Sequence, residues 1–515
     1  MSTEKKETIP DAGVRALTHY QRRMPPWRFE LRRSLIPLVR WETPYIAKFQ
    51  ATCRTSVLDA YFAFTANLGT HTFFMTALPI CYWCGYPDTG QALVRMLAAG
   101  VYLSGFSKDL LCLPRPLSPP LQRITMSGSA ALEYGFPSTH TTNAVSVAIY
   151  SLYKLHVSRP NLDHHLFLFL NVLCYLYAFS ISIGRVYCGM HGFFDVGTGA
   201  ALGALIGLAC VACGSAFDSW ILTCRWVEVA LVVAALVVAV RIYPEPADSC
   251  PCFDDSVSFL GVMIGTEVGA WHYAKHLTWT HIQSDTPLAQ AYSFANQNPF
   301  KVTTRVVGGI MVVFAWRAIT KPLLLRWLPP IFRLVDQVGV RLPRRHFLHA
   351  RDYTSVPTLR KDDNVLPPAS EIPAMISQIT SPRKRTVSVG PQSEADAREY
   401  VANLRERRSR GQPVAVGWKQ VGKKAEVNNS ATLDTASPLG ERSSIVKGEV
   451  DPAIIQQARE PDNPEVDEDR EVFSFLKRAR IRYDAEVITK LIVYAGIGWL
   501  ATEGNPVWFS WLGLV

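Results

Sequence analysis

Charged residues are scarce in this chain of 515 residues: they make up 19% of it, against 48% for hydrophobic residues. Soluble domains carry about 25% charged residues, so this balance argues against a fully soluble protein. The apolar residues are also gathered into runs that are long enough to cross a bilayer. Composition therefore indicates an integral membrane protein.

Other familiar signatures are missing as well. The first 50 residues lack the apolar core of a cleavable signal peptide, so we expect the first membrane helix to act as an uncleaved signal. Cys81 and Cys84, like Cys210 and Cys213, have CxxC spacing, but no second pair with a histidine completes a zinc site. The net charge of +10 comes without an aromatic-studded basic module that reads bases. Anionic lipid headgroups are therefore the expected partners, and nucleic acid is not.

The apolar runs divide the chain into five parts: a basic polar N-terminal segment (1–55), a membrane core (56–275), further membrane segments (276–330), a hydrophilic and largely disordered insertion (331–485) and an apolar segment (486–515). Counting these runs predicts an all-α polytopic membrane protein with about eight or nine spans. The stretch 193–213, which contains GTGAALGALIG, has the small residues that allow membrane helices to pack closely. No internal repeat is visible, and the sequence leaves the oligomeric state open.

Cationic, hydroxyl, imidazole and carboxylate side chains are concentrated between residues 108 and 195. They form three clusters: KDLLCLPRP with Lys108 and Arg115, YGFPSTH with Ser138, Thr139 and His140, and GRVYCGMHGFFD with Arg185, His191 and Asp195. Taken singly, each cluster has an ordinary explanation as an interfacial anchor, a helix cap or a structural pair. Ionisable residues at the ends of membrane spans more often indicate function, and three such clusters in order are a strong sign.

Cations, hydroxyl groups, histidines and a carboxylate together are the side chains needed to hydrolyse a phosphate ester. The first requirement of that reaction is a site for the phosphate group. Lys108, Arg115 and Arg185 supply fixed positive charge, and arginine offers the bidentate geometry that phosphate prefers. Ser138 and the backbone amides near Thr139 add neutral donors if a helix begins there. No carboxylate cluster of magnesium type accompanies these residues, so the predicted chemistry requires no metal and no other cofactor.

A nucleophile and a proton donor complete the predicted mechanism. His191 and Asp195 are spaced i, i+4 on one helical face, so the carboxylate can hold one imidazole N–H and fix the tautomer. The other ring nitrogen is then a nucleophile directed at phosphorus. His140 is placed to protonate the leaving alkoxide and then to activate the water that resolves the phosphohistidine.

The three clusters resemble the signature K-x6-RP, PSGH and SR-x5-H-x3-D of the type 2 phosphatidic acid phosphatase superfamily, which includes the vanadium haloperoxidases. Thr139 stands in place of the signature glycine, and Gly184 in place of the serine before Arg185. The flanking residues, over 55–275, are similar to the sphingosine-1-phosphate phosphatase branch and most similar to its fungal long-chain-base-phosphate members. This resemblance implies the helical core of that superfamily, metal-independent cleavage of sphingoid base 1-phosphates, and residence in the endoplasmic reticulum.

The resemblance also assigns roles to individual residues. It implies that His191 is the nucleophile, Asp195 its orienting partner and His140 the general acid. It implies phosphate binding by Lys108, Arg115, Ser138, Thr139, His140 and Arg185. Two alternatives stay open: a phosphatase for another lipid or isoprenoid phosphate, such as phosphatidate or a polyprenyl diphosphate, and a non-catalytic transporter or lipid-binding relative. The intact histidines and aspartate favour an enzyme.

The orientation of the three clusters follows from the loops that flank them. The loop 154–165 is basic and lies opposite the clusters, whereas the loop 244–255 is acidic and lies on their side. The positive-inside rule therefore predicts an active site that faces the lumen. The basic N-terminal segment argues the other way, and we suspect that the run Val57–Trp83, which polar residues interrupt, is miscounted as one span.

Three further features stay open at this point. Glu267 lies within an apolar run and is a candidate for binding the amine of a sphingoid base, although a helix-packing carboxylate is the more ordinary explanation. Cys250 and Cys252 are able to pair if their loop faces an oxidising lumen. Thr386 and Ser388 resemble a basophilic kinase site within the hydrophilic insertion.

Overall fold

The computed structural model describes residues 12–13, 17–65, 71–117, 120–121, 123–124, 133–248, 250–279, 298–338, 347–356 and 482–514. These residues are almost entirely helical, and the strand pairing among them is an isolated bridge between Leu348 and Tyr483. Most of the hydrophilic insertion, with Thr386 and Ser388, lies outside the described residues.

The helices are α1 (Leu17–Arg23), α2 (Pro26–Cys53), α3 (Ser56–Thr65), α4 (His71–Trp83), α5 (Pro87–Leu111), α6 (Thr139–Val157), α7 (His164–Tyr187), α8 (Phe193–Thr223), α9 (Trp226–Ile242), α10 (Cys252–Trp279), α12 (Pro299–Gln337), α16 (Asp484–Trp499) and α17 (Asn505–Trp511). Among the described residues, four helical segments are long and apolar enough to cross a membrane: α7, α8, α12 and the α16–α17 segment. This agrees with a helical membrane protein, but it does not establish the predicted eight or nine spans. The run Val57–Trp83 contains two helices, α3 of 10 residues and α4 of 13 residues. Each is shorter than the roughly 20 residues that one crossing needs.

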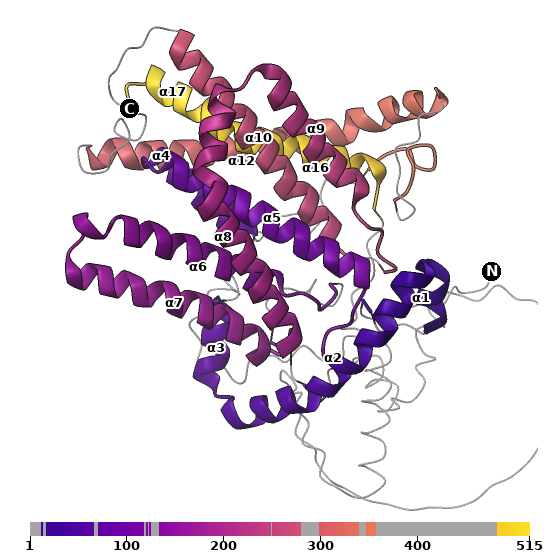
Figure 1. Cartoon of the computed structure of the whole chain (residues 1–515). Helices are drawn as coiled ribbons and strands as arrows, with labels where there is room; N and C mark the ends of the chain where they lie inside the picture. Colours follow the sequence, from indigo (N-terminus) through magenta and orange to yellow (C-terminus); the bar gives the residue numbers. More distant parts are fainter. Residues whose placement is uncertain are drawn as a thin grey trace, which may run out of the picture.

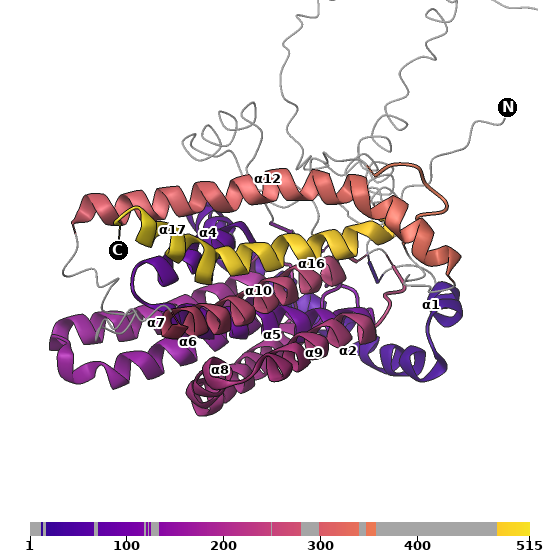
Figure 2. The ribbon, with the colours of Figure 1, turned by 90° about the horizontal axis from the view of Figure 1, so that it is seen from above.

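Helix α5 runs through the middle of the bundle, between the α6–α7 hairpin and the α10–α16 pair (Figure 1). Seen from above, α12 and α16 lie side by side on one face, and α8 and α9 lie on the opposite face (Figure 2). Buried side chains of α4, α5, α10, α12 and α16 form the largest core, among them Trp83, Leu97, Phe259, Val313 and Val493. The Trp83 indole also donates to the Ala501 carbonyl over 3.1 Å, which fixes the C-terminal helices to α4.

The N-terminal segment packs against the end of the bundle where α5 ends. The Arg28 guanidinium donates to the carbonyls of Asp109 and Leu110, and Arg32 donates to the Cys112 carbonyl. Both arginines are buried. Their guanidinium groups satisfy carbonyl groups that the end of α5 leaves without helical partners. Because this charge is used inside the protein, it is a weak indicator of membrane orientation. Part of the argument that the basic N-terminal segment made against a luminal site is therefore removed.

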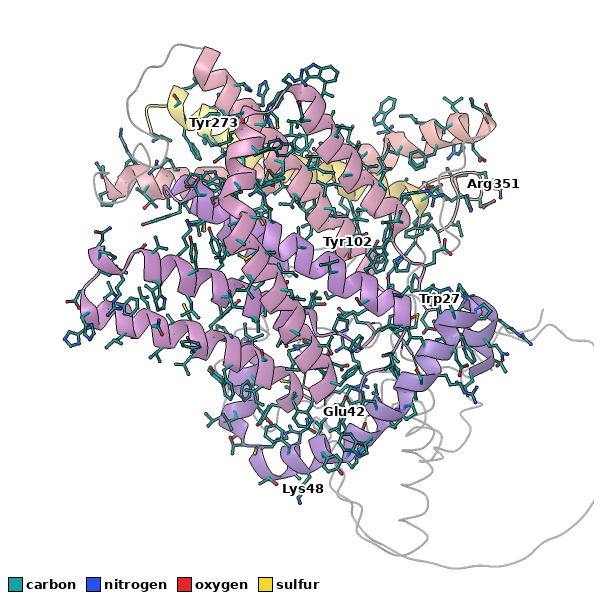
Figure 3. All side chains as sticks on the ribbon, viewed as in Figure 1. Trp27, Glu42, Lys48, Tyr102, Tyr273 and Arg351 are labelled. Carbon is teal, nitrogen blue, oxygen red and sulfur yellow. The ribbon has the colours of Figure 1, made fainter. Side chains whose placement is uncertain are left out.

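Helix α2 presents different side chains to the bundle and to its surroundings. Glu42 lies on the side of α2 that faces the bundle, whereas Lys48 points away from it (Figure 3). Further along the buried side, the Gln50 amide donates to the Tyr187 carbonyl at the end of α7 over 2.8 Å. Helix α2 therefore runs from the end of α5 to the end of α7 and covers the region between them.

The glycines of α8 allow it to lie directly against α6, as the small-residue stretch predicted. Gly199, Gly203 and Gly207 face the backbone of α6, and a Cβ atom at Gly203 would lie 2.3 Å from the Thr142 carbonyl oxygen. That distance is far below van der Waals contact, so only glycine fits here. This close contact aligns the first turn of α6 with the first turn of α8.

Replacing Gly203 by valine should destabilise the protein by about 1–3 kcal/mol, because α6 and α8 must separate to admit the side chain. Gly197→Val is the matched control, since a Cβ atom at Gly197 meets nothing within 4 Å. Both changes replace glycine by the same residue in the same helix, so helix propensity cancels. Unfolding of the purified proteins in detergent measures the difference, and equal stabilities would show that the glycine contact is unimportant.

Candidate active site

The candidate residues lie where four helices end or begin at one end of the bundle. Helix α5 ends at Leu111, α6 begins at Thr139, α7 ends at Tyr187 and α8 begins at Phe193. Ser138 N donates to the Asp195 carbonyl over 3.1 Å, which ties the start of α6 to the start of α8. Residues that are far apart in the sequence thereby meet in one buried group.

The first cluster depends on a sharp turn at the end of α5. Cys112 takes a left-handed conformation with φ of 51° and donates its amide to the Lys108 carbonyl, which ends the helix. The chain then brings Arg115 next to the turn before α8: its Nη1 donates to the Met190 carbonyl over 2.7 Å and lies 3.2 Å from His191 Nε2. Lys108 and Arg115 are both buried.

The second cluster forms the start of α6. Ser138 is the N-cap residue: its Oγ accepts from the Thr141 amide over 3.4 Å and from the Thr141 hydroxyl over 3.0 Å. The Thr139 hydroxyl is 2.8 Å from the Ser104 hydroxyl of α5. Both hydroxyl groups that we expected at the phosphate therefore also have local partners. The amides at the start of a helix point out of its end, and of those in the first turn of α6 the Thr141 amide is engaged by Ser138.

His191 is fully enclosed, and its two ring nitrogens face different groups. Nδ1 donates to the Gly135 carbonyl over 2.8 Å, whereas Asp195 Oδ2 is 3.7 Å away. The nearer acceptor is thus a backbone carbonyl that the sequence did not identify, and it requires the proton to be on Nδ1. Nε2 is then left with a lone pair, and it points towards Arg115.

Asp195 holds the turn that carries His191. Its Oδ2 accepts from the Gly192 amide over 2.9 Å, which closes the first turn of α8. Glu42 of α2 supports the same turn, because its Oε2 accepts from the Phe194 amide over 3.0 Å. Glu42 is a second residue that the sequence did not identify, since it belongs to a polar segment that showed no link to the clusters. Burial raises its pKa above the ordinary value for a glutamate.

Burial, together with the surrounding charge, keeps the His191 imidazole neutral. Burial lowers the pKa of His191 well below 6.5, and the nearby cations Arg115, Arg185 and Lys108 lower it further. A neutral imidazole with the proton on Nδ1 has a nucleophilic Nε2 at neutral pH. His140, on the first turn of α6, also contributes to lowering this pKa.

Arg185 contributes a donor that the described part of the chain does not satisfy. Its side chain is buried at the end of α7, and its Nε has no hydrogen-bond partner among the described residues. A buried donor without a partner costs about 1–3 kcal/mol, a cost that a bound anion would remove. Together with Lys108 and Arg115, this arginine gives the candidate site three cations, a charge that suits a multiply charged anion.

Glu133 is a third residue of this site that the sequence did not identify. Its Oε2 lies 3.1 Å from Arg115 Nη2 and 3.5 Å from Lys108 Nζ. Burial alone would raise the pKa of Glu133, but Lys108, Arg115 and Arg185 outweigh it and lower the pKa. The carboxylate is therefore ionised and in contact with cations that we expected to hold phosphate. One feature of the sequence indicated a role for Glu133: this acidic residue directly precedes the YGFPSTH cluster, in a region of cationic and hydroxyl side chains.

Among the described residues, Glu267 makes its contacts away from the candidate site residues. Its carboxylate is fully buried and pairs with the Arg95 guanidinium over 2.5 and 2.9 Å, and the same arginine contacts Asp218. These three residues join α10, α5 and α8 within the bundle. The helix-packing explanation is thus the correct one for Glu267, and a role in amine binding finds no support.

Within the described ranges, one group of metal-type donors lies beside the site. The ligand atoms of Asp109, Cys250 and Cys252 are within 4.8 Å of one another, and all three residues are buried. Cys250 Sγ is 2.6 Å from Cys252 Sγ, and both are free thiols in this structure. Burial raises the pKa of both thiols.

Comparison with known proteins identifies the family. The sequence profile of the PAP2 superfamily matches residues 90–219. The dihydrosphingosine 1-phosphate phosphatase of Schizosaccharomyces pombe is 41% identical over 310 residues, which are 59% of this chain and 72% of that protein. A dihydrosphingosine 1-phosphate phosphatase of Saccharomyces cerevisiae is 32% identical over 313 residues, 61% of this chain and 74% of that protein. The chain belongs to the PAP2 superfamily, in its sphingosine-1-phosphate phosphatase branch.

PAP2 membership confirms the resemblance that the three clusters carried. Sphingosine-1-phosphate phosphatase 2 of Homo sapiens is a more distant relative, 27% identical over 210 residues, which are 41% of this chain and 51% of that protein. The matched PAP2 region contains all the candidate residues, from Lys108 to Asp195. No solved structure matches the chain.

Proposed function

We propose that this protein is a metal-independent phosphatase that removes the phosphate group from sphingoid long-chain base 1-phosphates. The observation that carries the proposal is the buried, neutral His191, whose Nε2 faces Arg115 at 3.2 Å within a group of cations. A nucleophile inside an anion site is what phosphoryl transfer to a side chain requires. The names of the relatives from Schizosaccharomyces pombe and Saccharomyces cerevisiae support the substrate class.

The proposed reaction begins when the phosphate group binds Lys108, Arg115 and Arg185, with the first-turn amides of α6 as neutral donors. Nε2 of His191 attacks phosphorus, an N–P bond forms and the ester P–O bond breaks. His140 donates a proton to the leaving alkoxide, which departs as the free sphingoid base. The contact from Nδ1 to the Gly135 carbonyl stabilises the positive charge that develops on the ring.

Water completes the proposed cycle. His140, now neutral, takes a proton from a water molecule as that water attacks the phosphohistidine. The N–P bond breaks, inorganic phosphate leaves, and His191 returns to its neutral form with His140 protonated again. Asp195 acts indirectly, because its carboxylate fixes the Gly192 amide and hence the turn that carries His191.

Phosphate release by the purified protein in detergent, with EDTA in excess, tests the function. We expect rapid release from dihydrosphingosine 1-phosphate, slower release from phosphatidate, and slower release from farnesyl diphosphate as a short polyprenyl diphosphate. Faster release from phosphatidate would keep the mechanism but assign the protein to another lipid phosphate. Binding of the lipids without any release would favour the transporter or lipid-binding alternative.

The proposal includes a location and an arrangement in the membrane. We propose residence in the endoplasmic reticulum with about eight or nine spans and the site facing the lumen. The charge of the loops supports this side, because the basic loop 154–165 lies at the far end of α6 and α7 from the site. The division into parts at 55, 275, 330 and 485 and the disorder of the insertion likewise remain predictions.

A further inference from the structure

Glu133 occupies the position that a phosphate oxygen would take. Its Oε2 contacts both Arg115 Nη2 and Lys108 Nζ, the two cations of the first cluster. A phosphate group that binds these cations must displace this carboxylate oxygen. In the free protein, Glu133 is therefore the internal partner of the anion site.

The displaced carboxylate stays near the phosphate, because hydrogen bonds hold the backbone of residues 133–135. Arg115 Nε donates to the Glu133 carbonyl over 3.1 Å, and the Gly135 amide donates to the Leu113 carbonyl over 2.9 Å. Between them, Tyr134 is buried, and its hydroxyl donates to Asp248 over 3.1 Å. The Glu133 side chain itself is partly exposed, so its end is able to turn aside while its Cα does not move.

This arrangement creates an electrostatic cost for an ordinary phosphate ester. A dianionic phosphate at Arg115 and Lys108 would take both cations and leave the Glu133 carboxylate beside it with like charge. A substrate that brings its own cation next to the phosphate removes that cost. A sphingoid base 1-phosphate does so, because its ammonium group is on the carbon next to the one that carries the phosphate.

We propose that Glu133 binds the ammonium group of the sphingoid base and thereby selects substrates that carry a free amine beside the phosphate. This inference rests on the proposed function, since it concerns the substrate of the same site. Two other carboxylates of the site are engaged elsewhere: Asp195 accepts from the Gly192 amide, and Glu42 accepts from the Phe194 amide. Glu133 is the one among these three that faces the phosphate-binding cations.

The experiment compares substrates with and without the positive charge. Dihydrosphingosine 1-phosphate carries the amine, its N-acetyl derivative has a neutral amide in that place, and octadecyl phosphate has no nitrogen. The measured quantity is the ratio of kcat/KM for the amine substrate to kcat/KM for each of the other two. This ratio does not depend on the fraction of folded enzyme, so a loss of stability does not affect it.

Wild-type protein should prefer the amine substrate, and Glu133→Gln should lower the ratio about tenfold or more, as expected for loss of a charged hydrogen bond. Turnover of octadecyl phosphate should rise in the same variant, because the like charge is gone. Glu30→Gln is the control: it removes the same charge from an exposed position of α2 that pairs only with Arg33 among the described contacts, and it should keep the wild-type ratio.

Three results would overturn the inference, and they are distinguishable. If wild-type protein prefers the amine substrate and Glu133→Gln keeps that preference, the role of Glu133 is wrong while the proposed function stands. If wild-type protein hydrolyses all three lipids with equal kcat/KM, amine selection is wrong while the phosphatase activity stands. If wild-type protein releases phosphate from none of the three lipids, the proposed function fails and the inference fails with it.

Discussion

Replacing His191 by alanine should abolish phosphate release, with a loss in kcat of about 10⁴-fold or more. The reason is that Nε2 of His191 is the proposed atom that bonds to phosphorus, and no other group of the described site replaces it. Arg115, at 3.2 Å, is a permanent cation, and the Gly135 carbonyl is already engaged with Nδ1. The variant should still bind substrate, because the three cations of the anion site remain.

The control for this variant is His156→Ala. His156 lies on α6, far along the helix from His140, and its exposed ring contacts the Leu152 carbonyl of its own helix. The same chemical change there should leave turnover at the wild-type level. Brief reaction with phosphate-labelled lipid, followed by alkaline quenching, should leave label on the wild-type protein and none on His191→Ala. Label or turnover that persists in His191→Ala would remove this residue from the chemistry.

The three clusters were predictable because each is read from neighbouring residues. Lys108 and Arg115, or His191 and Asp195, lie within a few positions of each other, and their chemistry is plain from the side chains. The close packing of α8 was predictable for the same reason, since glycines at intervals of four residues share one helical face.

The Gly135 carbonyl and Glu42, which the sequence did not identify, depend on contacts between distant segments. The Gly135 carbonyl binds His191 across 56 residues, and a backbone carbonyl has no signature in the sequence. Glu42 reaches the start of α8 from a segment 152 residues earlier. Glu267 is the converse case: its apolar surroundings indicated an unusual carboxylate, but only the fold shows that Arg95, 172 residues away, is its partner.

Burial of charge was the least predictable property of the N-terminal segment. Arginines near tryptophans are typical of a membrane interface, where they face headgroups. Arg28 and Arg32 instead donate to carbonyls at the end of α5 and are buried. The sequence pattern is the same in both cases, because it contains no information about which helix end lies nearby. The position of α2 was therefore not derivable from composition.

Replacing Arg115 by alanine should lower kcat/KM by about 10³-fold, close to the largest loss seen when one charge-stabilising donor is removed. Arg115 has two functions at once: it is a proposed phosphate ligand, and its Nη1 donates to the Met190 carbonyl beside His191. Arg115→Lys should recover only a small part of the loss, because a single ammonium group is unable to hold that carbonyl and a phosphate oxygen in the same geometry. Arg225→Ala, at an exposed position that pairs with Glu228, is the control and should have wild-type activity.

The pH dependence separates the charge of Arg115 from a merely structural role. After burial, Arg115 is the largest cause of the lowered pKa of His191. Removing this cation should therefore raise the pKa of His191 towards its ordinary value. Since the neutral imidazole is the nucleophile, a higher pKa means a larger protonated, inactive fraction at any pH near neutrality. The acid limb of kcat/KM for the free enzyme should then move to higher pH in Arg115→Ala than in the wild type, measured with the same substrate. An acid limb that stays in place while activity falls would mean that Arg115 acts by holding the turn at Met190, and that its charge does not act on His191.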